Sequence, residues 1–263
     1  MTDGDGPSAL LHQIVAAVDC GEPVVVATVV DTLNAAPSHA GTKMLVYADG
    51  RCSGSIGGGA VEARVAAEAR EALADGRGRL VHYDLLELGM CGGEMTVYLE
   101  PQLPPPTVLV VGCGHVGRAV VELAHWLGFH VIATDDRVEL VTEELLPDAD
   151  FLAPGHIGEA LRGVCISEQT HVVLATRGTT VDVEALPLLL AGPARSIGVL
   201  GSRRRWQETR TELLAHGVSE QSLDRVKTPI GLDLGARTPR EIAVAIMGEI
   251  LALRREPNGQ RLS

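Results

Sequence analysis

Two kinds of apolar pattern alternate along the second half of this chain. Short runs rich in β-branched residues predict buried strands, and apolar residues spaced three or four positions apart predict helices. The predicted strands are Val108–Val111, His130–Thr134, Phe151–Leu152, His171–Ala175 and Ser196–Leu200. The predicted helices are Ala119–Leu127, Leu140–Leu146, Ile157–Arg162, Val183–Leu190 and Arg203–His216. This alternation favours a parallel sheet that is covered by helices.

The first part of the chain mixes the same two patterns without regular alternation. Helices are predicted over Ala9–Val18 and Ala60–Leu73. Strands are predicted over Pro23–Val30, Lys43–Tyr47, Arg51–Ile56, Leu80–Tyr83 and Met95–Leu99. The Asp49-Gly50 pair between the second and third of these strands is a good hairpin signal. We therefore expect a mixed α/β domain here.

A cluster of prolines, Pro101, Pro104, Pro105 and Pro106, separates the two patterns. Such a stretch favours extended, semi-rigid geometry and is disfavoured inside a sheet. The 263 residues are enough for two domains of ordinary size. The sequence thus predicts an N-terminal domain over residues 1–100, a proline-rich linker over 101–107 and a C-terminal domain over 108–263.

The segment after the first strand of the second domain reads Gly112-Cys113-Gly114-His115-Val116-Gly117. Gly112 would permit a tight turn, Gly114 a close approach of the backbone to a pyrophosphate, and Gly117 close packing of helix on strand. The next strand ends at Asp135-Asp136, about 20 residues from the first glycine, where an acid can bind a ribose hydroxyl. The predicted fold class is therefore α/β, an N-terminal mixed α/β domain followed by a Rossmann-like parallel-sheet domain.

Four turns should meet at the carboxyl edge of this parallel sheet, which in open α/β sheets forms the ligand crevice. They are Gly112–His115, Asp135–Arg137, Thr176–Gly178 and Gly201–Arg204. The arginines in the last two turns are suited to clamp a phosphate. Two alternatives stay open: His115 either faces a ligand or fills space, and Asp136 with Arg137 forms either a ribose site or a local ion pair.

The last predicted helix has the clearest beginning. Thr238-Pro239-Arg240-Glu241 combines an N-cap, a proline at the first helical position and a capping-box glutamate. The helix continues through Ile242–Leu253 and is apolar nearly all round. It should be buried in the domain or in a contact between subunits, so we expect a homodimer.

Composition and charge narrow the possible partners. A net charge of −12 argues against nucleic acid and anionic membranes, and an aromatic content of 3% argues against platforms on which bases stack. No run approaches the length of a membrane span, and the N-terminus lacks the apolar region of a signal peptide. The five cysteines are widely spread without a C-x-x-C pair, which fits a reducing cytoplasm.

Several motifs follow one another in an order that resembles one known family. They are Gly54-Ser55-Ile56-Gly57-Gly58-Gly59-Ala60-Val61-Glu62, Cys91-Gly92-Gly93, Gly112–His115, Asp135–Arg137, Thr176–Gly178, Gly201–Arg204 and Pro229–Gly235. From about Ala27 to Arg254, this series resembles the xanthine dehydrogenase accessory proteins of the XdhC/CoxI type. The resemblance implies a non-catalytic chaperone that binds the molybdenum cofactor in its molybdopterin form. It would pass this cofactor to the apoenzyme of a molybdenum hydroxylase, of the xanthine dehydrogenase or carbon monoxide dehydrogenase type.

The cofactor-binding candidates come from the glycine loops and the charged turns. They are Gly57, Gly58, Gly59, Cys91, Gly112, Gly114, His115, Gly117, Asp135, Asp136, Arg137, Arg177, Ser202 and Arg203. The triple glycine before a helix is suited to bind a phosphate, although it is also suited to a tight turn alone. Cys91 is the candidate metal ligand, since thiolates bind soft metals, and the alternative is a small buried or hinge residue.

The chain departs from the family pattern at two of these motifs. Ala60 follows the triple glycine, where the family usually has cysteine, and Thr179 follows the Thr-Arg-Gly turn, where it usually has histidine. A thiol role at position 60 therefore cannot transfer to this chain. Two other functions stay open: an NAD(P)-dependent oxidoreductase, for which we find no convincing catalytic set, and a non-catalytic module that senses a dinucleotide.

Overall fold

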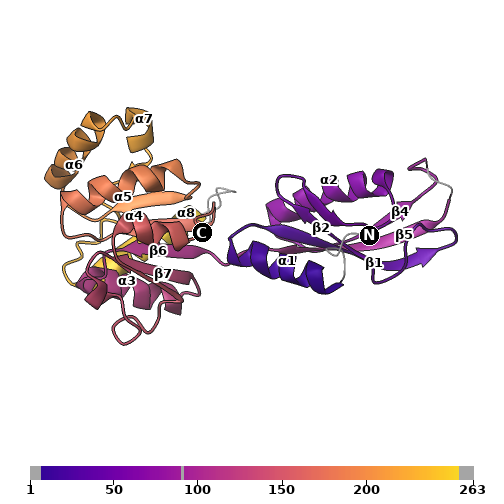
Figure 1. Cartoon of the computed structure of the whole chain (residues 1–263), viewed down its shortest axis with the longest axis horizontal. Helices are drawn as coiled ribbons and strands as arrows, with labels where there is room; N and C mark the ends of the chain where they lie inside the picture. Colours follow the sequence, from indigo (N-terminus) through magenta and orange to yellow (C-terminus); the bar gives the residue numbers. More distant parts are fainter. Residues whose placement is uncertain (1–6, 90–91, 255–263) are drawn as a thin grey trace. The chain divides into compact units, whose positions relative to one another are not determined.

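The chain forms two compact units, with the boundary between Pro104 and Pro105 (Figure 1). The structure, a computed structural model, describes residues 7–89 and 92–254. Each unit has its own sheet and its own hydrophobic core.

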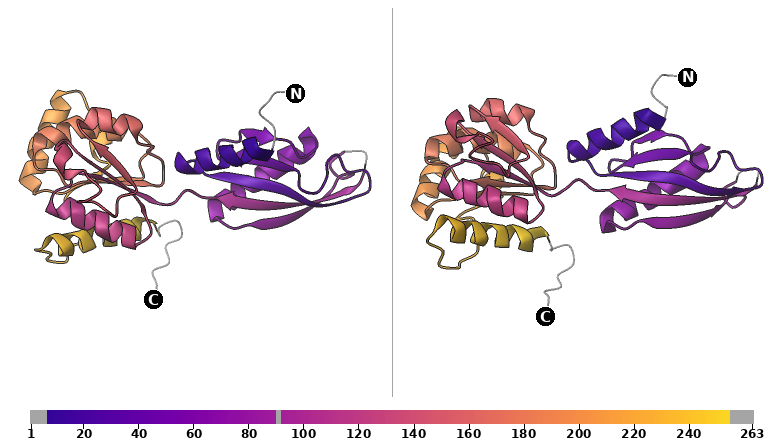
Figure 2. Two further views of the ribbon diagram at one scale, coloured as in Figure 1. Left: turned by 60° about the horizontal axis from the view of Figure 1, so that its bottom comes forward. Right: turned by 90° about the horizontal axis from the view of Figure 1, so that it is seen from below.

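The N-terminal unit is built on an antiparallel sheet of five strands. In spatial order these are β3 (Cys52–Gly54), β2 (Lys43–Tyr47), β1 (Val24–Leu33), β5 (Glu94–Gln102) and β4 (Arg79–Asp84). Helix α2 (Gly59–Asp75) packs on one face of the sheet and α1 (Pro7–Asp19) on the other (Figure 2). Because side chains alternate along a strand, β1 directs Val25 toward α2 and Val24 toward α1, and is buried on both faces.

The C-terminal unit is built on a parallel sheet of six strands. In spatial order these are β11 (Val226–Lys227), β10 (Ser196–Val199), β9 (Thr170–Leu174), β6 (Thr107–Val111), β7 (His130–Asp135) and β8 (Phe151–Pro154). The strand order changes direction between β6 and β9, as in a Rossmann fold. The predicted fold class is therefore confirmed.

Helices cover both faces of this sheet. The core on one face is formed with α3 (His115–Trp126) and α8 (Pro239–Arg254), which lie side by side in Figure 2. The core on the other face is formed with α4 (Ile157–Ala160), α5 (Thr179–Ala191), α6 (Arg203–Ala215) and α7 (Glu220–Leu223). Two 3₁₀ turns, η1 (Val138–Leu140) and η2 (Leu161–Gly163), complete the unit.

The last helix begins as the sequence predicts. The backbone N–H of Thr238 donates to Glu241 Oε2 at 2.9 Å, and the N–H of Glu241 donates to Thr238 Oγ1 at 3.3 Å, which forms a capping box. The domain buries only one side of α8, since Ile246 and Met247 face the core while Val244 is 52% exposed. Whether a contact between subunits covers the other side stays a prediction.

The prediction that the proline stretch 101–107 lies outside the sheets is wrong at both ends. Pro101 belongs to β5, where it pairs with Val25, and Thr107 begins β6. β4 pairs with β5 only as far as Leu99, so one side of β5 is an open edge at Pro101. A proline is tolerated at such an edge because no neighbouring strand needs its missing N–H.

The predicted helix over Leu140–Leu146 is also wrong. The segment contains the end of η1 followed by turns, and Leu146 precedes Pro147, which disfavours the helical conformation. The apolar spacing here reflects burial instead, since Val141 and Leu146 both contact the core. The sequence patterns also do not predict α7 and β11, because both elements are too short to display a period.

Candidate functional site

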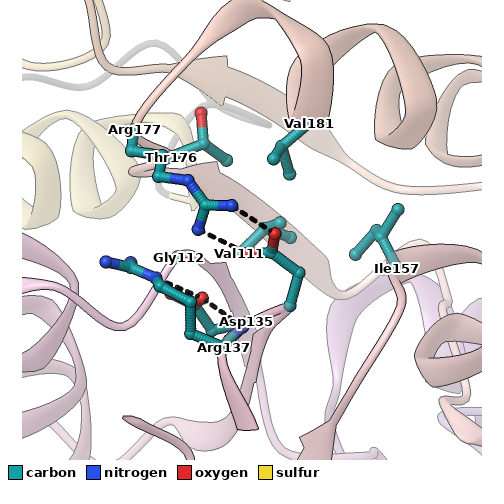
Figure 3. A pocket seen from close by; sticks show the side chains of 9 residues that line it. Val111, Gly112, Asp135, Arg137, Ile157, Thr176, Arg177 and Val181 are labelled. Carbon is teal, nitrogen blue, oxygen red and sulfur yellow. Dashed lines mark hydrogen bonds and ion pairs between the residues drawn. The ribbon is translucent and has the colours of Figure 1, made fainter.

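A pocket lies at the carboxyl edge of the parallel sheet, where β6 ends between β7 and β9. The residues that line it are Val111, Gly112, Asp135, Asp136, Arg137, Ile157, Thr176, Arg177 and Val181 (Figure 3). Three of the four predicted turns thus contribute to one site, at the point where ligands bind in folds of this kind.

The three glycines of the loop after β6 differ in what surrounds them. Gly112 has a φ of +106°, and a Cβ there would lie 2.6 Å from the carbonyl oxygen of Ala175. A Cβ on Gly117 would lie 1.8 Å from the carbonyl oxygen of Gly112, so α3 packs against the loop without room for a side chain. A Cβ on Gly114, the N-cap of α3, would extend into open space, with no heavy atom of the non-neighbouring described residues within 4 Å. The predicted roles of Gly112 and Gly117 are confirmed, and open space at Gly114 is what a close approach of a ligand needs.

Asp135, at the end of β7, holds the glycine loop in place through a hydrogen bond. Its carboxylate accepts hydrogen bonds from the backbone N–H of Cys113 at 2.7 Å and from the backbone and guanidinium of Arg137 at 2.8–2.9 Å. Burial alone would raise the pKa of Asp135, but these hydrogen bonds lower it to about 2. The side chain is 2% exposed, so this carboxylate is engaged inside the protein.

Asp136 faces the crevice instead. Its carboxylate accepts two hydrogen bonds from Arg177, at 2.9 and 2.6 Å, across the end of β6. Asp136 is 33% exposed and Arg177 51% exposed. The sequence left open whether Asp136 and Arg137 form a local ion pair; Arg137 pairs with Asp135, and Asp136 pairs with the more distant Arg177.

Sequence reasoning missed Arg205, which holds the turn that carries Arg177. Its guanidinium donates to the carbonyl oxygens of Thr176 and Gly178, at 2.9 and 3.1 Å, and to the carboxylate of the buried Asp182. Asp182 also accepts a hydrogen bond from the hydroxyl of Thr176. Burial raises the pKa of Asp182, and these hydrogen bonds offset part of that rise. Ser202 could have identified Arg205 from the sequence alone. As the N-cap, Ser202 sets where α6 begins, and this determines which of the arginines 203–205 faces the turn at Thr176–Gly178.

The other predicted residues of this unit lie around the crevice. Ser202 is the N-cap of α6, and its hydroxyl accepts a hydrogen bond from the backbone N–H of Arg205 at 3.2 Å. Arg203 and His115 are exposed at the first positions of α6 and α3, outside the set that lines the pocket. Cys113 is buried, and its burial raises the pKa of the thiol to about 12.

The triple glycine of the N-terminal unit forms the loop that leads into α2, with Gly58 as N-cap. Gly57 and Gly58 both have positive φ values, +116° and +133°. Glu62, in the first turn of α2, folds back, so that its Oε1 accepts hydrogen bonds from the Ser55 hydroxyl at 2.6 Å and the Gly58 N–H at 3.4 Å. Although burial opposes it, these bonds lower the pKa of Glu62. The loop therefore already holds an anion, supplied by its own helix.

Cys91, the predicted metal ligand, lies outside the described residues. Within residues 7–89 and 92–254, no group of three or more His, Cys, Asp or Glu side chains is arranged to hold a metal ion. Across the same ranges, no helix is long and apolar enough to cross a membrane.

The fold and this crevice define a two-unit α/β protein whose second unit is a Rossmann domain. Two family models match the chain, "XdhC and CoxI family" over residues 17–84 and "XdhC Rossmann domain" over residues 108–250. The chain therefore belongs to the XdhC and CoxI family, and the resemblance seen in the motifs is confirmed.

Similar proteins with curated names carry related descriptions. YqeB of Escherichia coli K12, an uncharacterized protein, is 35% identical over 90% of this chain and 44% of its own length. A probable xanthine dehydrogenase subunit from Bacillus subtilis 168 is 32% identical over 60% of this chain and 46% of its own length. The chain thus spans less than half of either relative. The molybdenum cofactor insertion chaperone PaoD of Escherichia coli K12 is 24% identical over 95% of this chain and 89% of its own length.

The fold also occurs in a solved structure. A crystal structure described as a xanthine dehydrogenase from Bacillus halodurans superposes with a TM-score of 0.53 and 21% identity, over 95% of this chain and 96% of that one. This likeness supports the arrangement of helices and strands and does not bear on the activity.

Proposed function

We propose that this chain is a cytoplasmic, homodimeric chaperone that binds the molybdenum cofactor in its molybdopterin form. It delivers the cofactor to the apoenzyme of a molybdenum hydroxylase, of the xanthine dehydrogenase or carbon monoxide dehydrogenase type. The name of PaoD, which aligns with nearly the whole of this chain, supports this role.

The ion pair of Asp136 with Arg177 is the observation that carries the proposal. The guanidinium of Arg177 is about half exposed and already binds two carboxylate oxygens side by side. A phosphate offers the same pair of oxygens with more charge, so the phosphate of molybdopterin can replace Asp136 on Arg177. Gly114 leaves space beside the N-terminus of α3, where backbone N–H groups favour an anion.

The triple glycine is the weaker of the two candidate phosphate sites. A phosphate there would have to displace Glu62 from the N–H of Gly58. Two arginines of this unit, Arg51 and Arg64, are also engaged, with Asp49 and Glu68 respectively. We therefore assign the phosphate to the crevice of the Rossmann unit.

The test is to purify the chain from a host that makes molybdopterin and to release bound small molecules with acid and an oxidant. Fluorescent pterin and molybdenum in stoichiometric amounts are expected, together with loss of both in Arg177→Gln. Arg204→Gln is the matched control, since Arg204 is 89% exposed, pairs with Glu208 of its own helix and is not among the described residues that line the pocket. Wild-type protein free of pterin would overturn the proposal.

The alternative is a dinucleotide site, in a sensing module or in an NAD(P)-dependent oxidoreductase. The strand order and the glycine loop favour it, since both are features of dinucleotide-binding folds. Asp135 is engaged with Cys113 and Arg137, so Asp136 is the acid that would bind a ribose. Stabilisation by NADH against heat, in protein without pterin, would favour this alternative, and hydride transfer would identify an enzyme.

A further inference from the structure

The outer side of the α3–α8 helix pair carries an unusually exposed tryptophan beside a hollow. Trp126, the last residue of α3, is 79% exposed. The hollow encloses about 580 Å³, its open mouth included. The residues that line it are Ala119, Glu122, Leu123, Trp126, Arg240, Ala243 and Val244. An indole left in water at the rim of an apolar hollow is typical of an interaction site.

The apolar surface continues beyond this hollow. Val244, 52% exposed, also lines a second hollow, which is formed with the segment before α8. Leu234 in that segment is 57% exposed. Several large apolar side chains are therefore exposed along one continuous strip, whereas a scattered single residue would need no explanation.

The charges on this strip indicate which partner fits it. Glu122 and Arg240 stand at the first hollow, with 3.6 Å between Oε1 and Nη2 and with most of each side chain exposed. The chain as a whole has a net charge of −12, so a partner selected by charge would be basic. One acid and one base side by side make this rim neutral, and its natural complement is an identical rim turned by a two-fold rotation.

We propose that this strip, defined by Trp126, Val244 and Leu234, is the surface through which two copies of the chain associate. Each copy inserts its Trp126 into the hollow of the other, and Glu122 of each copy faces Arg240 of the other. A knob and a hollow on one surface are self-complementary, as a closed two-fold dimer requires. This interface would form the homodimer of the proposed function, whichever ligand the crevice binds.

The first test measures mass by light scattering over a dilution series of the full chain. Wild-type protein is expected to be a dimer, and Trp126→Ala to weaken it by about thirtyfold or more, as for a central tryptophan of an interface. The control is Leu188→Ala, because Leu188 is 48% exposed on α5, on the opposite face of the sheet. Circular dichroism and a thermal scan confirm that each variant is folded.

The second test reverses the two charges separately. Glu122→Arg makes the rim positive and Arg240→Glu makes it negative, so each variant alone is expected to repel itself and remain monomeric. An equimolar mixture of the two variants is expected to recover a dimer that contains one copy of each. If the two variants were monomeric because they had misfolded, mixing them would not restore a dimer, since neither variant can refold the other.

The outcomes separate the interface from the other proposals. A wild-type chain that is monomeric throughout overturns both the interface and the homodimer. Dimers that persist unchanged in Trp126→Ala and in both charge variants overturn the interface alone. A wild-type monomer whose Trp126→Ala variant fails to activate the hydroxylase would assign the strip to the client enzyme, against this proposal. Pterin content, measured on the same samples, reports on cofactor binding separately.

Discussion

Arg177 and Asp136 are 41 residues apart in the chain and bind each other through two parallel hydrogen bonds, Nη1 to Oδ1 at 2.9 Å and Nη2 to Oδ2 at 2.6 Å. The pair joins the turn after β9 to the turn after β7, and so crosses the end of β6 between them. Both residues line the crevice, so the carboxylate of Asp136 competes for the group that an incoming phosphate would use.

Removing this competitor should strengthen ligand binding. In Asp136→Asn the carboxylate charge is lost and Arg177 is released, so we expect retention of pterin to rise about threefold, the effect of one partly exposed ion pair. The measurement is the fraction of pterin that remains after dialysis, compared with wild-type protein. Glu208→Gln, which releases the exposed Arg204 in the same way, should leave retention unchanged. Lower retention in Asp136→Asn would mean that Asp136 itself contacts the ligand.

The buried pair of Arg205 with Asp182 should matter for stability as well as for position. Asp182 is fully buried, so Asp182→Asn leaves a guanidinium without its charge partner and should lower the free energy of unfolding by about 3 kcal/mol. Urea unfolding measures this loss. In Arg205→Lys the charge remains but the several hydrogen bonds to the turn at Thr176–Gly178 do not, so pterin retention should fall more than stability.

A comparison of the glycine loop with the arginines of α6 shows which features can be predicted from the sequence. The glycine loop could be predicted because its constraints are local: Gly112 needs a positive φ, and Gly117 has a backbone oxygen where a Cβ would lie. Arg203 and Arg205 look alike in a run of arginines. Only the phase of α6, fixed by the N-cap at Ser202, places Arg205 against the turn and leaves Arg203 exposed.

The same limit explains the acids and the triple glycine. Sequence places Asp135 and Asp136 together, but Asp135 is the last buried residue of β7, whereas Asp136 begins the turn after the strand and is partly exposed. Glu62 belongs to the family-like motif, yet only the fold brings its carboxylate to the N–H of Gly58. An anion-binding loop can thus be predicted from glycines, whereas the anion that occupies it depends on tertiary structure.

Two glycine substitutions should separate folding from binding in the Rossmann loop. Gly117→Ala forces a Cβ onto the carbonyl oxygen of Gly112 and should cost about 3 kcal/mol of unfolding free energy. Gly114→Ala meets open space at an ordinary negative φ, so its stability should stay within about 0.5 kcal/mol of wild type. Its added methyl group stands where a ligand would approach the backbone, so pterin retention should fall. Thermal scans and pterin assays on both variants check this, and normal retention in Gly114→Ala would place the ligand elsewhere.

A buried histidine should make the stability of the Rossmann unit depend on pH. His171 in β9 is 1% exposed; its Nδ1 is hydrogen-bonded with Ser196 Oγ at 2.7 Å, and its Nε2 is buried without a partner among the described residues. Burial, with Arg195 and Arg254 nearby, lowers the pKa of His171 to about 4. A folded-state pKa below the unfolded value means that protons bind the unfolded chain first, so stability is lost as pH falls from about 6.5 to about 4.

The free energy of unfolding should fall by about 3 kcal/mol over this pH range. The fall should be smaller in His171→Gln, although that variant is less stable at neutral pH. Urea unfolding at a series of pH values measures it, with His115→Gln as the control because His115 is exposed. Asp135, whose pKa is lowered to about 2, contributes a separate loss below about pH 4 that both variants retain. If His171→Gln loses as much stability as the wild type between about pH 6.5 and 4, another group causes the pH dependence. Protonation of His171 then does not destabilise the folded chain.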